Sequence, residues 1–135
     1  MIRMRCQMKP FVFFCAAFFL VVTFSSAFAD SAEEMLSACR PIAKGDISGD
    51  YVKFPQNFST GNCWGAFTVI QKMIVRVDDH RRPLFGVCAP ASSTLSQLIA
   101  VFVDFAEKNP QRLHEDFFDV SIESLQEAFP CKIKK

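Results

Sequence analysis

Four cysteines beyond the first 29 residues constrain this chain more than any other feature of its sequence. They are Cys39, Cys63, Cys88 and Cys131. Successive cysteines are 24, 25 and 43 residues apart, with no C-x-x-C motif and no neighbouring pair of histidines, a pattern that disfavours a zinc site. An even number of cysteines in a small exported domain is typical of a disulfide framework. We therefore predict two disulfides and no bound metal.

The first 29 residues have the order expected of a secretory signal peptide. Residues 1–9 are short and basic, residues 10–24 are almost entirely apolar, and residues 27–29 (Ala-Phe-Ala) form a small-x-small cleavage site. The apolar run of about 15 residues is shorter than the roughly 20 that span a bilayer, which disfavours a retained membrane anchor. Cleavage after Ala29 leaves a single exported domain, residues 30–135, of 106 residues.

The charge of the exported domain argues against nucleic acid as a partner. The whole chain has 15 basic and 14 acidic side chains, and the leader carries three of the basic ones and none of the acidic ones. The formal net charge therefore changes from +1 for the whole chain to −2 for the domain. No basic cluster remains that is large enough to bind a phosphate backbone.

The segment after the predicted cleavage site begins as a helix. Ser31 can cap it, and two carboxylates follow in the first turn, near the positive end of the helix dipole. Pro41 is expected to end the helix. Residues 44–60 contain two glycines and a proline without a sustained period, so we expect a long loop there, with a turn at residues 46–49.

A second and stronger helix is predicted from residue 63 to residue 77. Its apolar residues recur at spacings of three and four, as one face of a helix requires. They are Cys63, Phe67, Ile70, Ile74 and Val77. Thr60, Gly61 or Asn62 can cap this helix. Several β-branched residues also permit a strand, but the period and the length favour a helix.

Two further helices follow a charged break at residues 78–83. Ser92 or Ser93 is expected to cap the third helix, and the Asn-Pro pair at residues 109–110 to stop it. The fourth helix is predicted from about residue 111 to residue 129. The expected core includes Phe67, Ile70, Ile74, Leu98, Ile99, Phe102, Phe117, Leu125 and Phe129. The sequence therefore predicts an all-α fold, a small disulfide-stapled four-helix domain.

The order of the helices favours one of the three possible disulfide connectivities. Cys39 ends the first helix and Cys63 begins the second, so an antiparallel arrangement brings these two residues together. Cys88 precedes the third helix and Cys131 follows the fourth, and the same reasoning pairs them. We favour Cys39–Cys63 with Cys88–Cys131 and leave the other two connectivities open. In the chain-entropy model, loops of this size contribute roughly 3.5–4 kcal/mol each.

No catalytic constellation is recognisable in the exported domain. His80 and His114 stand beside acidic residues but lack any metal-ligand spacing, so solvated side chains near helix ends are the simpler interpretation. The sequence has no G-x-S-x-G, P-loop or dinucleotide motif, and disulfide-bonded cysteines cannot act as nucleophiles. Trp64, next to Cys63, fits a core or disulfide-packing residue better than a ligand platform. We expect a protein that is not an enzyme, binds no cofactor and works by binding a partner.

Several short motifs occur in one order along the exported domain. They are Gly61-Asn62-Cys63-Trp64-Gly65-Ala66-Phe67, Val87-Cys88-Ala89-Pro90, Gln97 with Val101 and Phe105, Lys108-Asn109-Pro110, and Leu125 with Phe129-Pro130-Cys131. With the leader, their order and spacing resemble the Rap/Tai family of periplasmic immunity proteins from Gram-negative bacteria. The resemblance covers most of the exported domain, from about residue 39 to residue 131.

The resemblance implies a function and a place of action. Proteins of this family bind peptidoglycan amidase toxins delivered by type VI secretion, and block them in the periplasm by occluding the amidase groove. They are helical, contain disulfides and are often dimeric. The resemblance therefore implies a secreted amidase effector as the partner and a possible homodimer, without nucleic acid or a membrane anchor. The matching motif residues are structural, so no toxin contact is carried over to this chain.

Two other classes of function are weighed against this one. A periplasmic acid-stress chaperone, or another small helical binding protein, would also be exported and disulfide-bonded. The 14 carboxylates make a response to acid possible, although the cysteine count and the terminal Phe-Pro-Cys suit the immunity family better. An enzyme is disfavoured because the chain lacks a catalytic constellation.

Residues 78–85 are the predicted partner-binding segment, because they join two helices and combine charges with apolar side chains. The candidate contacts are Asp78, Asp79, Arg81, Arg82, Leu84 and Phe85. The two arginines could pair with carboxylates of a partner, and the phenylalanine could act as an apolar anchor. The disulfide at Cys88 would hold the end of the segment, which lowers the cost of ordering it in a groove.

Two alternatives to this surface stay open. The first is the segment 44–60, whose Tyr51 and Phe54 could instead cover the core or form a dimer contact. The second is that the 78–85 segment is a solvated charged loop without any binding role.

Overall fold

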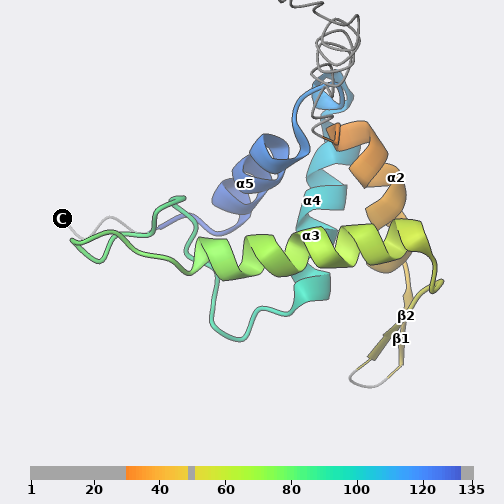
Figure 1. The fold of residues 1–135 in the computed structure, drawn as a ribbon, viewed down its shortest axis with the longest axis horizontal. Helices are drawn as coiled ribbons and strands as arrows, with labels where there is room; N and C mark the ends of the chain where they lie inside the picture. Colours follow the sequence, from red (N-terminus) through yellow and green to blue (C-terminus); the bar gives the residue numbers. More distant parts are fainter. Residues whose placement is uncertain (1–29, 49–50, 132–135) are drawn as a thin grey trace, which may run out of the picture.

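A computed structural model of the protein describes residues 30–48 and 51–131, and four α-helices make up most of this part of the chain (Figure 1). In chain order the elements are α2 (Ala32–Ala43), β1 (Asp46–Ser48), β2 (Tyr51–Lys53), α3 (Phe58–Ile74), α4 (Leu95–Lys108), the 3₁₀-helix η1 (Pro110–Arg112) and α5 (Phe117–Ala128). The predicted all-α, disulfide-stapled fold is confirmed. The predicted signal peptide, residues 1–29, lies outside the described residues. None of the described helices is long and apolar enough to cross a membrane.

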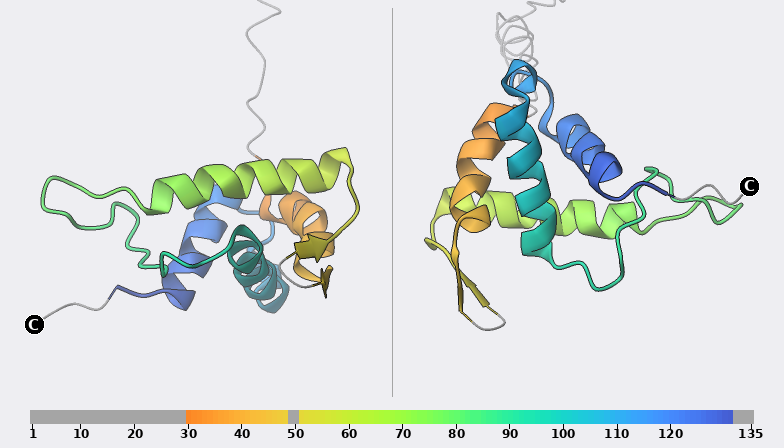
Figure 2. Two further views of the ribbon diagram at one scale, coloured as in Figure 1. Left: turned by 90° about the horizontal axis from the view of Figure 1, so that it is seen from below. Right: turned by 180° about the vertical axis from the view of Figure 1, so that it is seen from behind.

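The helices meet around three phenylalanine rings. Phe67 of α3, Phe102 of α4 and Phe117 of α5 lie with their ring centroids between 5.3 and 5.6 Å apart in each pair. Two of the three pairs meet edge to face, an arrangement that the charge distribution of aromatic rings favours. Met35 and Ile42 of α2 belong to the same buried cluster. Figure 2 shows α3 lying across one side of the layer formed by α2, α4 and α5.

Eight of the nine residues predicted for the core are buried. They are Phe67, Ile70, Ile74, Leu98, Ile99, Phe102, Phe117 and Leu125. Phe129 is the exception and is half-buried. It is the C-cap residue of α5, where its backbone (φ −129°, ψ 61°) departs from the helical conformation.

The two disulfides form in the pairs that the helix order favours. Cys39 of α2 is bonded to Cys63 of α3, with Cα atoms 5.3 Å apart, and both residues are buried. Cys88, ahead of α4, is bonded to Cys131, after α5, with Cα atoms 5.0 Å apart. Beside the second disulfide, the Cys88 N–H donates a hydrogen bond of 2.9 Å to the Phe129 carbonyl. The chain before α4 is therefore tied to the chain after α5.

The first helix begins as predicted and ends later than predicted. The Ser31 hydroxyl caps α2 by accepting a hydrogen bond from the Glu34 N–H at 3.3 Å. The helix then continues through Pro41 to Ala43. A proline in a helix removes one backbone hydrogen bond and crowds the carbonyl four residues earlier, and because just two helical residues follow Pro41, both effects are confined to the end of the helix.

Residues 44–60 are not the uninterrupted loop that the sequence predicts. They contain an antiparallel hairpin of β1 and β2, in which Ile47 pairs with Val52. Strands of three residues are too short to give a recognisable alternation of apolar and polar side chains. Gly45 lets the hairpin lie against the end of α2, because a Cβ there would be only 2.6 Å from the Lys53 carbonyl oxygen.

The boundaries of α3 differ from the prediction at both ends. Asn57 caps the helix: its Oδ1 accepts from the Thr60 N–H at 3.0 Å, and the Thr60 hydroxyl accepts from the Asn57 N–H at 3.2 Å. Thr60, predicted as a cap, is therefore the third residue of the helix. Val77, predicted on the core face, lies beyond the end of the helix, pairs with Pro83 and is 53% exposed.

The start of α4 is set by Thr94 and not by the predicted Ser92 or Ser93. The Thr94 hydroxyl accepts from the Gln97 N–H at 3.3 Å, and Gln97 Oε1 accepts from the Thr94 N–H at 2.9 Å. Ser92 is followed three positions later by Leu95, which cannot return such a bond, and Ser93 by Ser96, whose side chain is shorter than that of Gln97; the reciprocal pair that forms is Thr94 with Gln97.

The last helix starts later than the predicted residue 111. Residues 110–112 form η1 instead, and α5 begins at Phe117. Asp116 Oδ1 caps α5 by accepting from the N–H groups of Phe118 and Asp119 at 2.8 and 3.3 Å. A backbone bridge between Asp116 and Ser31 ties this cap to the start of α2.

Candidate partner-binding surface

The 78–85 loop follows α3 and projects beyond the end of that helix (Figures 1 and 2). The Asp78 N–H donates to the Arg82 carbonyl at 2.8 Å, and the Leu84 N–H donates to the Arg76 carbonyl at 3.0 Å. The two sides of the loop therefore pair like the arms of a short hairpin. A loop that is already ordered loses less conformational entropy when it binds.

Within the loop, the Asp78 carboxylate binds both the backbone N–H and the guanidinium of Arg82. Asp78 Oδ1 accepts from the backbone N–H groups of Arg82 and His80, at 2.8 and 2.9 Å. Asp78 Oδ2 accepts from Arg82 Nε at 2.8 Å, and the Arg82 guanidinium completes an ion pair with the same oxygen. The backbone N–H of Arg82, together with these other bonds, lowers the pKa of the Asp78 carboxyl below its ordinary value. Both side chains therefore hold the shape of the loop.

Two residues of α5 brace the other side of the loop. The Phe85 ring meets the Phe118 ring edge to face, with centroids 5.7 Å apart. Gln126 Nε2 donates to the Phe85 carbonyl at 2.8 Å. The sequence reasoning did not identify Phe118 or Gln126, and no local signal marks them, because the contacts join segments more than 30 residues apart.

The remaining candidate contacts divide into exposed and half-buried side chains. Asp79 and Arg81 are exposed, and Leu84 is 57% exposed. Phe85 is half-buried against α5, so it differs from the exposed apolar anchor that the sequence predicts. Arg82 is exposed as well, but it is bound to Asp78. The exposed candidate contacts that do not hold the shape of the loop are Asp79, Arg81 and Leu84, which we call the loop tip.

A second candidate surface lies at the opposite end of α3, near the β1–β2 hairpin (Figure 1). Trp64 is 38% exposed and stacks on Phe54, with ring centroids 5.5 Å apart. The prediction that Trp64 packs in the core or against the disulfide is wrong, because its place on α3 turns it outward while neighbouring Cys63 faces inward. The two rings, with Gln56, Asn57, Thr60 and Gly61, line an open groove of about 580 Å³, which we call the aromatic groove. The side chain of Tyr51 lies outside the described part of the chain.

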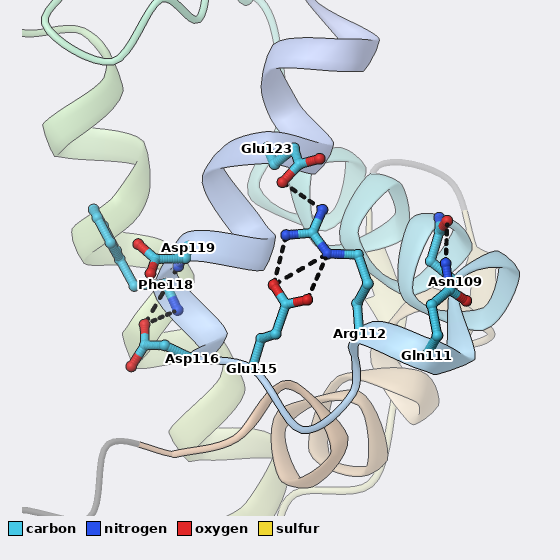
Figure 3. A network of polar contacts seen from close by, with 8 residues as sticks. All are labelled: Asn109, Gln111, Arg112, Glu115, Asp116, Phe118, Asp119 and Glu123. Carbon is cyan, nitrogen blue, oxygen red and sulfur yellow. Dashed lines mark hydrogen bonds and ion pairs between the residues drawn. The ribbon is translucent and has the colours of Figure 1, made fainter.

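A cluster of charges at the junction of η1 and α5 has a structural role. Figure 3 shows the Arg112 guanidinium between the carboxylates of Glu115 and Glu123. Its contact with Glu115 is 2.6 Å long, and the hydrogen bonds to Glu115 and then to Glu123 raise the pKa of Arg112. The same guanidinium lies 6.0 Å from the centre of the Phe105 ring. The guanidinium thus bridges two carboxylates, and with its contact to the Phe105 ring it joins α5 to the end of α4.

The two histidines do not form a centre for chemistry. Both His80 and His114 are exposed, and the backbone N–H of His80 donates a hydrogen bond to Asp78 Oδ1. Within residues 30–48 and 51–131, no group of three or more His, Cys, Asp or Glu side chains could hold a metal ion.

Comparison with known proteins identifies one family. The family model described as Rap1a immunity proteins matches residues 21–131 of the chain. No curated protein and no solved structure matches the chain significantly. The matched region includes all four helices and both disulfides.

Proposed function

Because this chain belongs to the Rap1a immunity protein family, we propose that it binds a secreted peptidoglycan amidase toxin and occludes its active-site groove without catalysing any reaction. The family match confirms the resemblance read from the sequence motifs, and it assigns the chain an immunity function against secreted toxins. The finer proposal is that the toxin is an amidase delivered by type VI secretion. The match over residues 21–131 is the observation that carries this function.

The proposed place of action is the periplasm. An amidase that cleaves peptidoglycan meets its substrate there, so a blocking protein has to be present in the same compartment. The four paired cysteines fit an oxidising compartment, in which disulfides persist. The signal peptide predicted for residues 1–29 would deliver the protein to it.

We propose the 78–85 loop as the part that enters the toxin groove. It projects beyond α3, its backbone is ordered by its own hydrogen bonds, and α5 braces it from one side. The loop tip offers one cation, one anion and one apolar side chain, which suits a partner surface of mixed character. A rigid protrusion can block a groove without any chemistry of its own.

The aromatic groove is the competing surface. Trp64 and Phe54 present stacked aromatic rings, and large aromatic side chains are among those that anchor protein interfaces. This surface could bind the toxin or a second copy of the chain. The two surfaces lie at opposite ends of α3, so they can be altered independently.

Binding titrations with matched double variants test this proposal. The probe is a peptidoglycan amidase effector of a type VI secretion system, with its catalytic cysteine replaced by alanine. Arg81→Glu/Leu84→Ala changes the loop tip, and Phe54→Ala/Trp64→Ala changes the aromatic groove. We expect the loop variant to bind at least about a hundredfold more weakly, and the groove variant to bind within a few-fold of wild type.

Two outcomes would contradict the proposal. Loss of binding only in the groove variant would move the toxin site to the aromatic groove. If the wild-type chain does not bind the amidase, but does prevent an unrelated unfolded protein from aggregating at low pH, the chaperone alternative replaces the immunity role. Circular dichroism of each variant provides the control for folding.

A further inference from the structure

Arg81 has a backbone conformation that its turn normally reserves for glycine. Residues 79–81 form the turn of a short hairpin, and the Asp78 N–H closes this turn by donating a hydrogen bond to the Arg82 carbonyl. The Arg81 N–H donates to the Asp78 carbonyl at 2.9 Å, and the φ angle of Arg81 is 58°. This is the three-residue hairpin loop in which a tight turn is followed by one left-handed residue. Glycine is the residue that such a position favours.

Gly86, five residues after Arg81, shows the residue type that a left-handed backbone favours. Gly86 has a φ angle of 64°, and no bulky side chain there has to be placed in a left-handed backbone. Arg81 is the one non-glycine residue with a positive φ angle among residues 30–48 and 51–131. A long, branched side chain is therefore present where the backbone disfavours it, and strain of this kind concentrates at functional sites.

The side chain of Arg81 also differs from that of its neighbour. Arg82 is bound to Asp78 through its Nε and its terminal nitrogen. Arg81 is exposed, and its guanidinium has no hydrogen bond or ion pair with any side chain in the described part of the chain. The side chain of Arg82 thus stabilises the loop, whereas Arg81 contributes through its backbone N–H and not through its side chain.

We infer that Arg81 is the specificity-determining contact of the loop, and that it pairs with a carboxylate at the mouth of the toxin groove. This inference rests on the immunity function proposed above, and it identifies Arg81 as the contacting residue and a carboxylate as its partner on the toxin. A guanidinium can form two parallel hydrogen bonds to a carboxylate, which fixes the orientation as well as the attraction. Leu84, which is also exposed in this loop, supplies the apolar contact of the same surface.

The inference predicts opposite effects of one substitution on stability and on binding. Arg81→Gly should raise the melting temperature of the free protein by roughly 2–8 °C, because glycine adopts the left-handed conformation without strain. The same variant should bind the inactive amidase at least about tenfold more weakly, because the charged contact is lost. Arg81→Lys keeps the charge and the strain, so its melting temperature should equal that of wild type and its affinity should lie between the other two.

Lys53→Ala is the matched control for the loss of one exposed positive charge. Lys53 is exposed in β2, near the other end of α3, so this variant should bind like wild type. Arg81→Gly that binds as tightly as wild type, or that melts at a lower temperature, overturns the inference and leaves the proposed function intact. Failure of the wild-type chain to bind the amidase overturns the proposed function, and the inference with it.

Discussion

Phe102 is the residue whose side chain contributes most clearly to the core. It is fully buried and contacts Phe67 and Phe117, which come from two other helices. Replacing it with alanine leaves a cavity that three rigid helices cannot close. We expect Phe102→Ala to lower the free energy of unfolding by about 3–5 kcal/mol in urea denaturation.

Phe58 provides the control for that measurement. It is the same residue type but 91% exposed at the start of α3. Phe58→Ala should change the free energy of unfolding by less than about 0.5 kcal/mol. A loss below about 1 kcal/mol for Phe102→Ala would show that the ring is not in the core.

Periodicity predicted most of the buried residues inside the helices, but it failed at helix ends, where Val77 is exposed and Phe129 is half-buried. Phe67, Ile70 and Ile74 follow a helical spacing, and all three are buried. Phe85 was misplaced for a different reason, because it is half-buried by Phe118, a residue far away in sequence. Side chains whose surroundings come from another element cannot be placed from local pattern alone.

At the scale of the helices, the reciprocal bonds between Thr94 and Gln97 define the start of α4. Thr94→Ala removes the side-chain acceptor for the Gln97 N–H. We expect this change to lower the free energy of unfolding by about 1 kcal/mol, as loss of a helix cap usually does. Ser92→Ala, in the predicted cap that the helix does not use, should have almost no effect. Equal losses for the two variants would contradict the assigned start of α4.

Helix ends were harder to predict than helix faces for a specific reason. Ser92, Ser93 and Thr94 are all able to cap, and the choice falls to the one with a glutamine three residues later. Asn57 and Thr60 form a similar pair that lies outside the predicted apolar stripe. The bracing of the 78–85 loop by Gln126 was beyond sequence reasoning, since it requires the relative positions of α3 and α5.

At the scale of the whole molecule, three carboxylates link stability to pH. Hydrogen bonds lower the pKa of the Asp78, Glu107 and Glu115 carboxyl groups. The largest contribution comes from the Arg82 backbone N–H for Asp78, from the Arg40 side chain for Glu107, and from the Arg112 side chain for Glu115. Because the folded pKa lies below the ordinary values of 3.8 for Asp and 4.5 for Glu, the stabilisation is fully present above those values. It is lost as the pH falls through the folded pKa of each group.

We therefore expect the urea midpoint to be nearly constant from about pH 7 to pH 5 and to fall below about pH 4.5. Glu115→Gln should reduce the size of that fall, because its bond to the Arg112 guanidinium no longer depends on ionisation. A midpoint that rises on acidification would contradict these pKa directions. Unfolding followed by circular dichroism at constant ionic strength provides the measurement.

The most direct test of the proposed immunity function is inhibition of the amidase itself. The rate of peptidoglycan hydrolysis by the active toxin is measured while a protein comprising residues 30–135 is added in increasing amounts. The toxin concentration is kept above the dissociation constant of the complex. We predict that the rate falls in proportion to the chain added and approaches zero when toxin and chain are equimolar, because each bound loop fills one groove. An amidase that remains fully active in a large excess of the folded chain would contradict the immunity function proposed for this protein.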